Sequence, residues 1–91
     1  MEFEWDEAKD RENLRKHDVR FETAKLVFDD PLAITFRADS DEAEEERFIT
    51  IGSARGMSVF FVVYTWRESV VRLISARTAS RLERRLYEEA Y

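Results

Sequence analysis

The 91-residue sequence has no cysteine, one histidine, one proline and two glycines. Without cysteine the chain can form neither a disulfide framework nor a thiolate metal site, and it has no thiol nucleophile. A zinc site with a single histidine would be unusual, so we expect neither metal nor cofactor. With 44% hydrophobic and 13% aromatic residues, the sequence predicts one folded domain over residues 1–91 rather than a disordered chain.

Long apolar runs are missing as well. No stretch approaches the roughly 18 apolar residues that a membrane span needs. The first ten residues, MEFEWDEAKD, are acidic and lack the apolar core of a secretion signal. The sequence therefore predicts a cytoplasmic location.

Charge is distributed unevenly along the chain. The net charge of −5 argues against a nucleic-acid partner. However, residues 39–46 hold six acidic side chains, and without them 15 basic residues stand against 14 acidic ones. Residues 67–85 contain six arginines and two glutamates. We expect an acidic loop and a cationic C-terminal part that suits a polyanion.

The densest apolar signal lies in the second half of the chain. Residues 59–66 are eight β-branched or aromatic residues, and residues 70–76 form a second apolar run. This pattern predicts two antiparallel strands in the middle of a sheet, joined by a tight turn. A two-residue turn would place Thr65 opposite Arg72, whereas a three-residue turn would place Trp66 opposite Arg72.

The rest of the chain completes an α+β fold. Periodicity predicts helices over residues 7–17 and 21–28 and strands over residues 32–37 and 47–53. Phe3 and Trp5 should lie in an extended start to the chain. A C-terminal helix should begin after Thr78 or Ser80, and Ser80 with Glu83 fits a capping box. We therefore expect two N-terminal helices, a four-stranded antiparallel sheet and a C-terminal helix, with the helices on one side.

Several motifs along the chain resemble one protein family. The first is Phe-x-Trp-Asp-x-x-Lys-x-x-x-Asn-x-x-Lys-His over residues 3–17. Further matching positions are Phe21, Ala24, Phe28, Arg47, Gly52, Val-Val-Tyr-Thr-x-Arg over residues 62–67, Arg72, Ile-Ser-Ala-Arg-x-Ala over residues 74–79, Glu83, Arg84 and Tyr87. Together they resemble the BrnT family of type II toxin-antitoxin ribonuclease toxins, whose fold is RelE-like.

The resemblance implies a toxin that cleaves RNA and inhibits translation. It also implies a BrnA-like ribbon-helix-helix antitoxin that neutralises the toxin, and contact with operator DNA only through that antitoxin. The chain departs from the family at residues 18–20, where a Gly-Val-Ser turn is common, and at its acidic run, residues 39–46. The acidic run disfavours tight non-specific RNA binding, because phosphate neutralisation supplies much of that affinity.

RNA cleavage by the 2′-hydroxyl needs a proton acceptor, a proton donor to the leaving oxygen and cations for the phosphorane charge. His17 is the only side chain whose ordinary pKa suits proton transfer near neutrality, and arginine matches two phosphate oxygens at once. For the metal-independent endoribonuclease that we expect, the predicted catalytic residues are Lys16 or His17 for proton transfer and Arg67 and Arg77 as phosphate clamps. The predicted RNA contacts are Lys9 and Arg72, with Tyr64 and Tyr87 as stacking or proton-donating groups.

Each assignment has a structural alternative. His17 can act simply as a cation at a helix C-terminus. The residues Lys9, Asn13 and Lys16 can form a solvated helix face. The aromatic residues, Tyr64 among them, are more often core than stacking platforms. The three arginines at 67, 72 and 77 can pair with the acidic loop or stack on Trp66.

Two other functions also fit the sequence. A non-catalytic partner that only binds the antitoxin and contributes to operon autorepression would explain the acidic balance. A plain RNA-binding module would use the arginines and exposed aromatics without cutting RNA.

Overall fold

The computed structural model describes residues 1–38 and 45–90. Most of the predicted acidic loop, residues 39–44, lies outside the described residues. The described elements are β1 (Glu2–Glu4), α1 (Glu7–His17), α2 (Phe21–Ala24), the 3-10 helix η1 (Lys25–Asp29), β2 (Ile34–Ala38), β3 (Arg47–Ala54), β4 (Ser58–Arg67), β5 (Val70–Thr78) and α3 (Arg81–Glu89). Across residues 1–38 and 45–90, no helix has the length and apolar character needed to cross a membrane.

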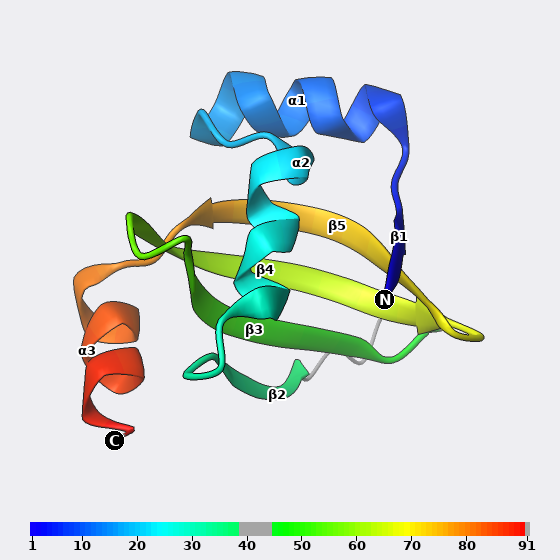
Figure 1. Cartoon of the computed structure of the whole chain (residues 1–91). Helices are drawn as coiled ribbons and strands as arrows, with labels where there is room; N and C mark the ends of the chain where they lie inside the picture. Colours follow the sequence, from blue (N-terminus) through cyan, green and yellow to red (C-terminus); the bar gives the residue numbers. More distant parts are fainter. Residues whose placement is uncertain (39–44, 91) are drawn as a thin grey trace.

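The α+β class is confirmed, but the sheet is mixed and five-stranded, in the order β1-β5-β4-β3-β2 (Figure 1). The expectation of four antiparallel strands is wrong because the extended start of the chain is itself a strand. Phe3 in β1 lies opposite Val71 in β5, and the two strands run parallel. A strand of three residues is too short to show alternation, so only its distant partner reveals it.

The helix predicted over residues 21–28 is divided into the short α2 and the 3-10 helix η1. Phe21, Ala24 and Val27 are spaced three residues apart, and all three are fully buried. A 3-10 helix has three residues per turn, so it keeps such a series on one face. The tighter winding therefore presents these side chains to the sheet.

Figure 1 shows that α2 and η1 cross one face of the sheet, that α1 lies beyond β5, and that α3 lies at one end of the sheet. The predicted capping box of α3 is present, with Ser80 and Glu83 each bonding the other's backbone. No residue of α3 is buried, however. The expectation that the helices share one side of the sheet is therefore wrong for α3, because this helix lacks a buried apolar face.

The β4–β5 hairpin follows the two-residue turn. Thr65 lies opposite Arg72 and Arg67 lies opposite Val70, while Glu68 in the turn has a φ of 58°. A positive φ at the first turn residue is typical of a type II′ turn. A register shift at residues 63–64 changes the alternation of β5. As a result, the arginines at 67, 72 and 77 all lie on the sheet face that α2 and η1 leave uncovered.

Candidate functional site

A groove lies between α1 and β5. Its volume is about 200 Å³, and it is lined by Lys9, Glu12, Asn13, Lys16, His17, Ile74 and Ser75. The α1 residues recur every three or four positions, so they share one face of the helix. Three predicted site residues, Lys9, Lys16 and His17, are thus brought together beside a strand.

Asn13 fixes this groove. Its side chain is only 5% exposed, so its assignment to a solvated helix face is wrong. The Asn13 Nδ2 donates hydrogen bonds to the carbonyl oxygens of Ala76 (2.7 Å) and Val19 (2.9 Å), and the Asn13 Oδ1 accepts one from the Ala76 amide (3.0 Å). The amide and the carbonyl of Ala76 are thus both hydrogen-bonded, as they would be beside a neighbouring strand. Strand β1 cannot supply these bonds, because it pairs with β5 only at residues 70–72. Asn13 is the only side-chain amide in the chain, which was the one sequence signal for this role.

The groove carries a surplus of basic groups. Glu12 is its one carboxylate, and the Lys16 Nζ lies 3.4 Å from the Glu12 Oε1. Within residues 1–38 and 45–90, no carboxylate lies within ion-pair distance of Lys9 or His17. His17 ends α1, so it also meets the structural alternative of a cation at a helix C-terminus. Both roles are compatible with its position.

Each of the three predicted arginines forms an ion pair with a carboxylate. Arg67 pairs with Glu45 at 3.0 Å, which is the predicted contact with the acidic run. Arg72 pairs with Glu4 of β1 at 2.7 Å. Arg77 instead pairs with α3. The expected pairing with the acidic run is thus found for Arg67, whereas Arg72 and Arg77 pair with carboxylates of other segments.

Arg67 and Arg77 share a sheet face but lie at opposite ends of it. Arg77 is opposite Phe61, six residues before Arg67 along β4, which corresponds to about 20 Å. The expected clamp of both arginines on one phosphate therefore does not fit the geometry. Arg77 is the nearer to the groove, since it follows Ser75 by two residues, or about 7 Å, on the same face of β5.

Arg77 forms two hydrogen bonds to Glu83, of 2.7 and 2.8 Å, and its guanidinium carbon lies 4.1 Å from the centre of the Phe61 ring. The hydrogen bonds from Arg77 lower the pKa of the Glu83 carboxyl to about 2, against the opposing effect of burial. The same pair raises the pKa of the Arg77 guanidinium. The Arg77 guanidinium therefore stays positively charged and can bind an anion.

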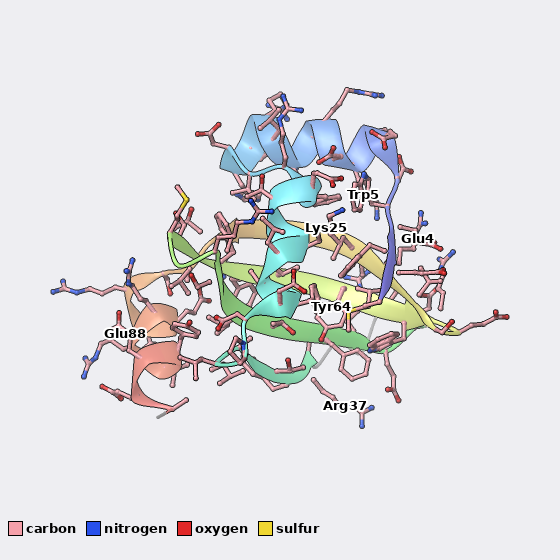
Figure 2. The ribbon with its side chains drawn as sticks, viewed as in Figure 1. Glu4, Trp5, Lys25, Arg37, Tyr64 and Glu88 are labelled. Carbon is pink, nitrogen blue, oxygen red and sulfur yellow. The ribbon has the colours of Figure 1, made fainter. Side chains whose placement is uncertain are left out.

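The two tyrosines do not join the groove. Tyr64 is 3% exposed, its hydroxyl lies 2.9 Å from the Thr50 Oγ1, and its ring packs 4.9 Å from that of Phe28 on η1 (Figure 2). The expected RNA contact of Tyr64 does not fit, because its ring belongs to the core. Tyr87 donates a hydrogen bond to the Asp30 Oδ2 at 2.6 Å.

Tyr87 lines a larger pocket of about 460 Å³ at the junction of η1, the β3–β4 turn and α3. Asp29, Asp30 and Arg55 also line it. Burial pulls the pKa of the Asp30 carboxyl up, but hydrogen bonds from Tyr87, Ser53 and Leu32 outweigh it and hold the pKa below its usual range. Two carboxylates make this pocket a poor place for RNA phosphate.

Comparison with known proteins agrees with the resemblance. The family described as "Ribonuclease toxin, BrnT, of type II toxin-antitoxin system" matches residues 5–83. The chain is similar to the crystal structure of the Brucella abortus ribonuclease toxin BrnT, with 27% sequence identity, a TM-score of 0.71, and coverage of 89% of this chain and 99% of that one. No curated protein matches the chain. Since the family match covers most of the sequence and the fold agrees, the chain belongs to the BrnT family of ribonuclease toxins of type II toxin-antitoxin systems.

Proposed function

We propose that this chain is a metal-independent endoribonuclease that cuts RNA in the groove between α1 and β5 and thereby inhibits translation. The supporting observation is the convergence of Lys9, Lys16 and His17 in that groove, beside Ser75. A site on a helix tied to a strand is more rigid than a site on a loop, and catalysis depends on such fixed geometry. Asn13 makes this connection between α1 and β5 through its hydrogen bonds to Ala76.

In the proposed reaction the 2′-hydroxyl attacks the adjacent phosphorus. The O2′–P bond forms and the P–O5′ bond breaks, leaving a cyclic phosphate and a 5′-hydroxyl. His17 takes the proton from the 2′-oxygen, and Lys16 is the candidate donor to the 5′-oxygen. Lys9 stabilises the charge that develops on the phosphorane. Arg77, about 7 Å along β5 from Ser75, binds the neighbouring phosphate of the RNA.

Further contacts would be made outside the groove, with the part of the RNA that extends beyond the cleaved phosphate. Arg72 and Arg67 lie further along the uncovered sheet face and would meet other phosphates of the same RNA. Tyr87 donates a hydrogen bond to Asp30 in a separate pocket, so its predicted RNA contact lies outside this path.

The test is cleavage of a labelled single-stranded RNA in EDTA by the parent, His17→Ala, Lys16→Ala and Arg11→Ala. Arg11 is the matched control, because it is a cation of α1 that does not line the groove. We expect His17→Ala to slow cleavage by about 10² or more, Lys16→Ala to slow it less, and Arg11→Ala to cut like the parent. Equal rates for all variants would refute the groove as the site, and loss of parental cleavage in EDTA would refute metal independence.

In the cell we propose that the toxin acts in the cytoplasm and that a BrnA-like ribbon-helix-helix antitoxin neutralises it and carries the complex to operator DNA. A second candidate is a non-catalytic partner of that antitoxin. The observation that favours it is the pairing of all three sheet arginines with carboxylates. Expression without the antitoxin separates the two: growth arrest with RNA loss supports the enzyme, and harmless accumulation supports the partner. A plain RNA-binding module would give salt-sensitive binding and no cleaved product.

A further inference from the structure

The ion pair between Arg77 and Glu83 is well shielded from solvent and is made through two hydrogen bonds. The Glu83 side chain is 19% exposed and that of Arg77 38%; among the ion pairs of the described residues only Arg72–Glu4, at 28% and 39%, is comparably shielded. Both carboxylate oxygens of Glu83 accept from the guanidinium, which lies against the ring of Phe61. A phosphodiester offers two oxygens in a similar arrangement, and arginine binds either group through two parallel hydrogen bonds.

The helix that delivers Glu83 is held mainly through polar groups. None of its residues is buried, and its two leucines, Leu82 and Leu86, are 68% and 49% exposed. Its attachments include the pair with Arg77 and the hydrogen bond from Tyr87 to Asp30. Because α3 buries little apolar surface, moving Glu83 away from the sheet sacrifices little hydrophobic stabilisation.

We propose that Arg77, stacked on Phe61, is a phosphate-binding site for RNA that the Glu83 carboxylate occupies in the free protein. This inference rests on the proposed function, since RNA is the substrate assumed. Arg77 lies about 7 Å along β5 from Ser75 in the groove, a distance suited to a phosphate next to the one that is cut. RNA then binds by exchanging one anion for another on the same guanidinium, and Glu83 acts as a built-in competitor.

The test compares Glu83→Gln with Glu88→Gln. Glu88 pairs with Arg84 at 3.1 Å on the same helix, away from the sheet (Figure 2), so both variants remove one negative charge from α3. Glutamine at position 83 can still close the capping box. Binding is measured by fluorescence anisotropy with a short 2′-O-methyl RNA, which cannot be cleaved by its own 2′-oxygen.

We expect Glu83→Gln to bind this RNA about tenfold more tightly than the parent and Glu88→Gln less than twofold more tightly. The double variant Arg77→Ala/Glu83→Gln should lose the gain. Glu83→Asp, which keeps the charge but shortens the reach, should fall between the parent and Glu83→Gln and decides the matter if Glu83→Gln does not fold. Equal affinities for the Glu83 and Glu88 variants would overturn the proposal and leave the pair purely structural. Absence of cleavage of ordinary RNA by the parent would instead contradict the proposed function, so the two failures are distinguishable.

Discussion

At Asn13, one side-chain amide supplies both hydrogen bonds that a neighbouring strand would give to Ala76. The same amide also donates a hydrogen bond to the Val19 carbonyl oxygen, just after α1 ends. Asp18 closes that helix in the left-handed conformation, at a φ of 57°, where the resembled family commonly has glycine. Aspartate tolerates this conformation better than most residues, so the departure from the family pattern leaves the junction intact.

Replacing Asn13 with alanine should lower the free energy of unfolding by about 2–3 kcal/mol, because it leaves buried backbone groups of Ala76 and Val19 unpaired. Asn13→Asp should cost at least as much, since a carboxylate would face two carbonyl oxygens. Urea denaturation measures both values. Arg11→Ala, on the exposed side of the same helix, is the control and should change stability by less than about 0.5 kcal/mol. A loss below that limit for Asn13→Ala would contradict the strand-like role.

Among the elements, α3 and η1 reach the sheet in different ways. The 3-10 helix η1 packs so closely on β3 that a Cβ atom added at Gly52 would lie 3.1 Å from the Val27 Cβ and 3.2 Å from the Val27 carbonyl oxygen. Helix α3 instead relies on Glu83 and Tyr87, and neither is fully buried. The first attachment is steric and apolar, so pH should affect it little; the second is ionic, so pH should affect it strongly.

The attachment of α3 should therefore weaken in acid. The folded pKa of Glu83 is about 2, below its ordinary value of 4.5, so the pair contributes fully above about pH 4.5 and its contribution is lost as pH falls towards 2. We expect the stability difference between the parent and Glu83→Gln to shrink by roughly 1–2 kcal/mol over this range, after allowance for solvent screening at Arg77. Denaturant unfolding at several pH values measures it. Some acid sensitivity should persist in the variant, because Asp30 also has a lowered pKa. A difference that is constant from pH 6 to pH 2.5 would rule out this contribution.

Over the whole molecule, the cationic C-terminal part that the sequence predicts is largely neutralised. Its sheet arginines are paired with carboxylates from three separate segments, represented by Glu4, Glu45 and Glu83. The groove adds three basic groups, Lys9, Lys16 and His17, to those available for RNA. With a net charge of −5, long-range attraction of RNA should be weak, so binding depends on a few local contacts.

The salt dependence of RNA binding should reflect this small number. If three cations, Lys9, Lys16 and Arg77, displace counterions from a short RNA that does not reach Arg67 and Arg72, the slope of log K against log salt should be about −2 for a single strand. Titration with the 2′-O-methyl RNA at several salt concentrations measures the slope. Lys9→Ala should reduce its magnitude by about 0.7, and Arg11→Ala should leave it unchanged. A slope steeper than about −4 would show that RNA covers a much wider basic surface than the groove.

The sequence by itself determined the local elements and the family. The β4–β5 hairpin, α1 and the capping box of α3 each follow from residues close together in the chain, whose periodicity and side-chain chemistry need no distant partner. Only the tertiary structure decided that β1 is a strand, that Asn13 is buried, and that Arg67 and Arg77 lie at opposite ends of one sheet face. Each of these depends on contacts between segments distant in sequence, and a one-residue change of register would have reversed which side chains meet.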